Sequence, residues 1–135
     1  MARRWWLGLP PLVAYSADVT ATLLGQPAEY WNGNSDRPLE ANPIGWWFLS
    51  IGPWVAVVAA ALWAIGFTLV VRYWRYRVPM AAILTASHTF GLSTWLIRLG
   101  WPGWIGVAIT FTIVMRLWTI CRRWDCDGAL VSPRR

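Results

Sequence analysis

Asp18, His88 and Arg98 are ionisable side chains that stand inside long apolar stretches of the sequence. An ionised carboxylate near the centre of a bilayer costs about 2.5–3.5 kcal/mol, so such a residue usually has a partner or a function. Thr22 follows Asp18 by four residues and would share its helical face. Arg98 would lie near the same end of its own stretch, within reach of Asp18. The sequence therefore supports two hypotheses for Asp18: a structural ion pair with Arg98, and a proton, ion or ligand site.

His88 is the only histidine of the chain, and small and hydroxyl-bearing residues surround it. Such residues let membrane helices approach closely, so a neutral imidazole hydrogen-bonded to a neighbouring helix is the structural interpretation. The alternatives are an axial ligand to a haem or a chlorophyll-type pigment, and a proton relay. One histidine cannot supply both axial ligands of a bis-histidine haem. We therefore predict no cofactor and no metal, and name His88 as the residue that would hold a pigment if one were bound.

Glu40 and Asn42 precede a short apolar run in the segment after the first apolar stretch. Asparagine before proline is typical of a helix cap, so we predict a short helix over Ile44–Ile51. This helix is too short to span a membrane, so it would lie in the outer interface or re-enter the bundle. In the second case Glu40, Asn42, Asp18 and a more distant His88 could hold a cation or do acid–base work. Otherwise Glu40 is an ordinary loop carboxylate and Asn42 an ordinary cap.

The elements that must position these residues follow from the composition. Hydrophobic residues make up 57% of the 135-residue chain and charged residues only 13%, against about 25% in ordinary globular domains. Four apolar stretches, over about residues 5–25, 53–72, 78–100 and 102–121, are each long enough to cross a bilayer. We predict an all-α integral membrane four-helix bundle, a single domain with an outer loop at 26–52 and a tail at 122–135. The composition excludes a disordered tail, a disulfide scaffold and a typical soluble enzyme.

The basic residues predict the orientation of this bundle. The formal charge is +6, and ten of the twelve basic residues fall at the N-terminus, around the second-to-third connection or near the C-terminus. These three regions share one side of a four-span protein, which the positive-inside rule makes cytoplasmic. Only Arg37 and Arg98 map to the outer side. We expect both termini in the cytoplasm, with the protein in a prokaryotic inner membrane and the first span uncleaved. Arginines spread in this way do not form a nucleic-acid-binding surface.

The first half of the chain contains a short sequence pattern that resembles one found in other membrane proteins. Asp18 with Thr22, followed by Glu40-Ala41-Asn42-Pro43, resembles a group of small polytopic membrane proteins of unknown function. These proteins carry a D-x-x-x-T late in the first helix and then E-x-N-P, and the resemblance covers about residues 17–71. It implies that Asp18, Glu40 and Asn42 form a linked site. It brings no known activity.

An ion or proton transporter is disfavoured, because the second and fourth spans hold almost no polar residues to line a path. Two functions remain for such a chain. Because nearly all residues lie in or near the bilayer and 13 are tryptophan, we expect an accessory or structural subunit of a larger membrane complex. Its partners would be the lipid bilayer and other integral membrane subunits, not nucleic acid. The alternative is an intramembrane protein that binds a small molecule or ion, or an enzyme, using Asp18, Glu40, Asn42 and His88. We assign no catalytic residue and do not favour an enzyme.

Cys121 and Cys126 fall in or next to the predicted tail. Free reduced thiols are the default on the cytoplasmic side of a membrane. A structural zinc site normally needs four ligands, which these two residues do not supply. We therefore expect neither a disulfide nor a zinc site at this end of the chain.

Overall fold

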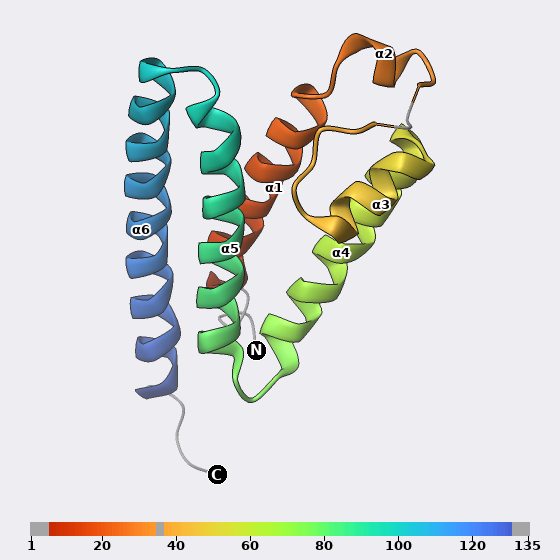
Figure 1. Cartoon of the computed structure of the whole chain (residues 1–135). Helices are drawn as coiled ribbons and strands as arrows, with labels where there is room; N and C mark the ends of the chain where they lie inside the picture. The colour runs from red at the N-terminus through yellow and green to blue at the C-terminus, as the bar shows by residue number, and fades with distance from the viewer. Residues whose placement is uncertain (1–5, 35–36, 131–135) are drawn as a thin grey trace.

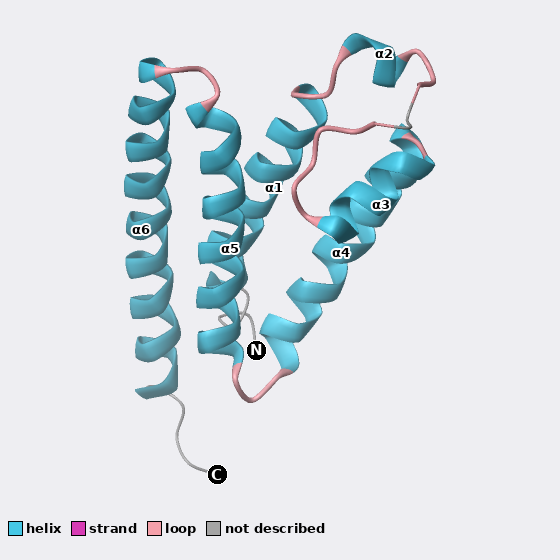
Figure 2. Ribbon diagram, in the orientation of Figure 1, coloured by secondary structure: helices cyan, strands magenta, loops and turns pink. Residues whose placement is uncertain are grey.

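The computed structural model of the chain describes residues 6–34 and 37–130, except for the side chains of 125–130. The described residues contain no strand. They form six helices: α1 (Leu9–Leu24), α2 (Ala28–Trp31), α3 (Pro43–Ile51), α4 (Pro53–Tyr73), α5 (Arg77–Ile97) and α6 (Trp101–Leu130) (Figure 1, Figure 2). The predicted all-α fold is confirmed.

Four segments of the described chain are long and apolar enough to cross a membrane. They are Trp6–Leu24, Pro53–Tyr73, Arg77–Ile97 and Trp101–Trp124, close to the four predicted spans. The chain is therefore a multi-pass membrane protein. One boundary differs: α6 continues to Leu130, nine residues beyond the expected end, because no proline after the first turn of α6 stops it before Pro133.

Helices α1 and α5 pack closely along their length (Figure 1). Small side chains make this possible: Ala14 of α1 and Ala81, Thr85 and Thr89 of α5 are all buried. The threonine hydroxyls donate to the carbonyls four residues earlier, so they need no partner on another helix. Helix α6 packs on the other side of α5, where Gly103 leaves no room for a Cβ beside the backbone of α5.

Helix α4 meets α5 at the short turn between them and diverges from it toward the other end (Figure 1). The chain that follows Arg37 runs back toward the middle of the bundle, and α3 then packs beside the first half of α4 (Figure 1). The predicted short helix is thus present, and it packs beside α4. It ends at Gly52, whose φ of 147° favours glycine, and Pro53 begins α4.

Two buried side chains hold the loop between α1 and α3 to the helices. Gln26 donates from Nε2 to the carbonyls of Thr22 and Leu39, at 2.9 and 3.0 Å, and its Oε1 accepts from the Leu39 N–H at 2.8 Å. The end of α1 and the start of the returning segment are therefore joined through one side-chain amide.

The second is Tyr30 of α2, whose hydroxyl donates to the carbonyl of Leu49 at 3.1 Å. In a continuous helix that carbonyl would accept from residue 53, but Pro53 has no N–H. The tyrosine thus satisfies a buried acceptor that the break between α3 and α4 leaves open.

Candidate functional site

The polar centre of the bundle is a contact between α1 and α5. Asp18 Oδ2 lies 2.9 Å from His88 Nδ1, between residues 70 positions apart in the sequence. Their side chains are 17% and 18% exposed. The two candidates that the sequence placed inside apolar stretches are therefore partners of each other, in a largely buried setting.

A glycine makes this contact possible. Gly91 lies three residues after His88 on the same face of α5, and a Cβ built there would sit 2.7 Å from both Asp18 carboxylate oxygens. That separation is shorter than any ordinary contact, so a larger residue at 91 would displace the carboxylate. Gly91 is therefore part of the site, because its lack of a side chain leaves room for the Asp18 carboxylate.

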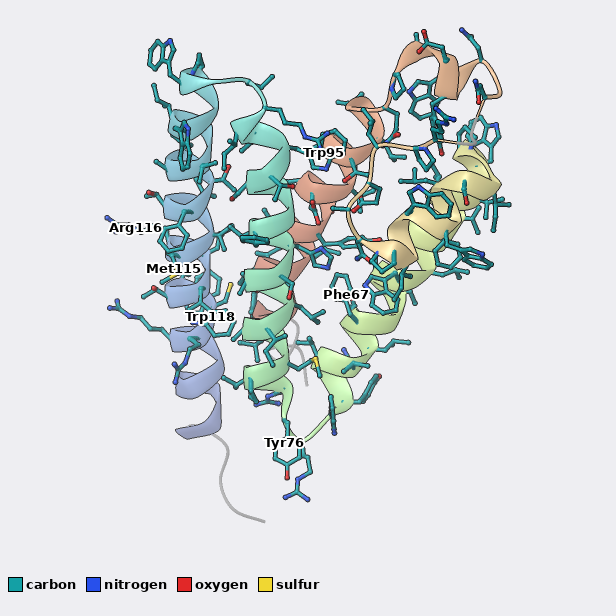
Figure 3. The ribbon with its side chains drawn as sticks, in the orientation of Figure 1. Phe67, Tyr76, Trp95, Met115, Arg116 and Trp118 are labelled. Carbon is teal, nitrogen blue, oxygen red and sulfur yellow. The ribbon has the colours of Figure 1, made fainter. Side chains whose placement is uncertain are left out.

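Two aromatic rings hold the imidazole in place. The Tyr15 ring is 4.8 Å from the His88 ring at an interplanar angle of 82°, and the Phe67 ring is 6.4 Å away. Tyr15 also contacts Phe67 edge-on at 5.2 Å, and its hydroxyl donates to the Ala60 carbonyl of α4 at 2.7 Å. Figure 3 shows Phe67 on α4. Both rings are buried, so they fix the orientation of the imidazole and leave little ring surface for a ligand.

The two imidazole nitrogens have different environments. A carboxylate at hydrogen-bond distance from Nδ1 places the proton on that nitrogen. Nε2 has no hydrogen-bond partner among the described residues, and it is not one of their fully buried unsatisfied atoms. Nε2 is therefore not fully enclosed by the described residues. It accepts a hydrogen bond when the ring is neutral and donates one when the ring is protonated.

Glu40 and Asn42 form a second, local pair. Glu40 Oε1 accepts from the Asn42 N–H at 2.7 Å, and Asn42 Oδ1 accepts from the Ile44 N–H at 3.0 Å. The predicted cap on α3 is confirmed. No hydrogen bond or ion pair within the described chain joins these two residues to Asp18 or His88.

The predicted ion pair between Asp18 and Arg98 is wrong. Arg98 follows the last residue of α5, and its guanidinium carbon lies 4.1 Å from the ring centroid of Trp95. This cation–π contact uses a ring one turn away, whereas His88 lies deeper in the bundle, opposite Asp18. Thr22 contributes through its carbonyl, which accepts from the Gln26 amide.

The described residues contain no group of three or more histidine, cysteine, aspartate or glutamate side chains that could hold a metal ion. Cys121 is a buried free thiol in α6, and the Cys126 side chain lies outside the described part. The absence of a cofactor stays a prediction. Nε2 of His88 is the atom that a haem or chlorophyll-type pigment would use.

No family model, no curated protein and no solved structure matches the chain. The resemblance based on the D-x-x-x-T and E-x-N-P motifs therefore stays a prediction. Tyr15, Phe67 and Gly91 were not predicted from the sequence as site residues. Helical spacing was the available signal for two of them, since Tyr15 stands three residues before Asp18 and Gly91 three after His88.

Proposed function

We propose that this membrane protein binds a lipid-soluble small molecule through Nε2 of His88. The observation that supports the proposal is the arrangement of the imidazole. Nδ1 contacts Asp18 at 2.9 Å, while Nε2 is not fully enclosed and has no hydrogen-bond partner in the described chain. When a second residue binds one imidazole nitrogen and orients the ring, the other nitrogen is left to bind a ligand.

The chemistry of the pair limits the ligand to two kinds of polar group. A neutral imidazole accepts a hydrogen bond from a hydroxyl at Nε2, and a protonated one donates to a carbonyl. The ligand would be a mainly apolar molecule with one hydroxyl or carbonyl group, which reaches the site from the bilayer.

The test is to purify the protein from its native membrane in mild detergent, extract it with organic solvent and identify what is released by mass spectrometry. We expect one molecular species at close to one per chain in the wild type. His88→Gln should lose it. Ser87→Ala is the matched control, because that exposed hydroxyl donates only to the Ile83 carbonyl of its own helix. Equal amounts of every extracted species from His88→Gln and Ser87→Ala would contradict the proposal.

A second function, an accessory subunit of a larger membrane complex, is supported by a tryptophan in the middle of α4. Trp63 is 57% exposed and lies about 15 Å along the helix from Pro53, near the centre of a 30 Å hydrocarbon core. Tryptophan usually lies at membrane interfaces, where its N–H finds a polar partner. A mid-span exposed indole is better explained by contact with another protein than by contact with lipid tails.

Co-purification tests this second function. Trp63→Leu should lose a co-purifying membrane protein, whereas Trp54→Leu at the outer end of the same helix should keep it. Trp54 is 82% exposed, so the two variants remove the same type of side chain from different depths. If no other protein accompanies the wild type in mild detergent, the subunit proposal is wrong.

A further inference from the structure

Helix α6 has two different faces. One face packs into the bundle and buries Gly103, Val114 and Cys121. The opposite face carries Thr112, Arg116, Thr119 and Arg123, at spacings of four, three and four residues, and all four are exposed. Figure 3 shows Arg116 projecting from α6 on the side away from α5. This outward polar face is unexpected on a helix that crosses a membrane.

The depth of the two arginines places them near one boundary of the hydrocarbon core. Arg116 lies about 22 Å along α6 from Trp101, and Arg123 lies about 10 Å further on. With a core of about 30 Å, Arg123 reaches the headgroup region and Arg116 lies inside the core. The long side chain of Arg116 can extend its guanidinium toward the same headgroups.

Among the side chains that the structure describes, none supplies an anion on this face. The acidic side chains that the structure describes are Asp18, Glu29 and Glu40, and none is on α6. The hydroxyls of Thr112 and Thr119 donate to carbonyls of their own helix, so the arginines are the free donors of the stripe.

We propose that Arg116 and Arg123 bind the phosphate of an acidic phospholipid in the leaflet at the C-terminal end of α6. Charge complementarity supports a lipid phosphate as the ligand of this face. The turn between α4 and α5 adds a third positive charge, Arg75, at the same end of the bundle (Figure 1). A second copy packed in parallel through this face would bring Arg116 against Arg116. Like charges at that depth repel, which excludes a homodimer through this face. The proposal is independent of the ligand proposed for His88.

The experiment uses the full chain in nanodiscs of phosphatidylglycerol and phosphatidylcholine in equal amounts. Lipids that stay bound on transfer to mild detergent are counted by native mass spectrometry. The wild type should retain phosphatidylglycerol in preference, and the preference should fall about fivefold for each arginine changed to glutamine. Arg116→Lys should retain most of it, because an ammonium also binds phosphate. Arg98→Gln removes an arginine from the other end of the bundle and should change nothing.

Three results would overturn the proposal. An unchanged preference in the Arg116→Gln, Arg123→Gln double variant would show that these residues do not select the lipid. Loss of a co-purifying protein with the lipid preference intact would assign the face to a carboxylate of a partner. A wild-type preference that does not weaken as sodium chloride is raised would also exclude an exposed arginine–phosphate contact, even if the double variant fails to fold.

Discussion

Replacing Gly91 by alanine tests whether the Asp18–His88 contact stabilises the bundle. The new methyl carbon would lie 2.7 Å from both carboxylate oxygens of Asp18, so either the carboxylate moves or α1 and α5 separate. A hydrogen bond to a charged group contributes about 1.5–3 kcal/mol to the free energy of unfolding. Overpacking a helix contact costs a similar amount, about 1–3 kcal/mol.

Alanine also has an opposite effect on stability. It favours a helix over glycine by about 1 kcal/mol, which offsets part of the loss. Gly66 is the matched control, because it lies within α4 and a Cβ there meets nothing within 4 Å. Gly66→Ala should therefore gain about 1 kcal/mol without a clash. The difference between the two variants isolates the clash, and we expect it to be about 1.5–3 kcal/mol.

The assay is the free energy of unfolding in mixed detergent micelles, measured for both variants and in an Asp18→Ala background. Without the carboxylate, Gly91→Ala should behave like Gly66→Ala, because the atoms it would meet are gone. If Gly91→Ala and Gly66→Ala are equally stable in the presence of Asp18, the carboxylate does not lie beside Gly91 and the described site is incorrect.

Three further predictions concern other contacts. The effects of Asp18→Asn and Arg98→Leu on the free energy of unfolding, measured by thermal melting, should add within about 0.5 kcal/mol, because the two residues are not partners. A double variant more stable than Asp18→Asn alone would support the ion-pair hypothesis instead. Burial raises the pKa of Tyr30 above its ordinary 10.0, so stability should be full below pH 10 and fall as pH rises above it. Tyr30→Phe should lose about 1 kcal/mol at neutral pH and show none of that alkaline loss. A cysteine at position 32 should react with an impermeant reagent from outside and one at position 75 should not; the reverse would refute the cytoplasmic location of both termini.

The spans and the short helix could be predicted because each depends on local sequence. Apolar runs of about 20 residues set the four spans, and the asparagine–proline and glycine–proline pairs set the ends of α3. The predicted end of the fourth span, near residue 121, does not give the end of α6, since a change from apolar to polar residues does not itself end a helix. The orientation of the spans in the membrane also stays a prediction.

The partner of Asp18 could not be predicted by the same means. Sequence distance from the end of a span gives the depth of a side chain, but not the direction in which it points around the helix axis. By depth alone, the long side chain of Arg98 and the imidazole of His88 were both available to Asp18. The packing of α1 against α5 decides between them, and it depends on small residues 60 to 70 positions apart, including Ala14 and Ala81.

The Asp18–His88 contact also has a consequence for how the protein is made. The two residues are 70 positions apart, and α4 lies between them in the chain. At about 5–20 residues per second, roughly 4–14 s pass between the synthesis of Asp18 and that of its partner. During this interval the first span carries an unmatched carboxylate, and with α5 it has the lowest mean hydropathy of the four spans, 1.2. We therefore expect the first span to be stably inserted in the bilayer only after α5 has been inserted beside it. The third span of the chain then stabilises the first.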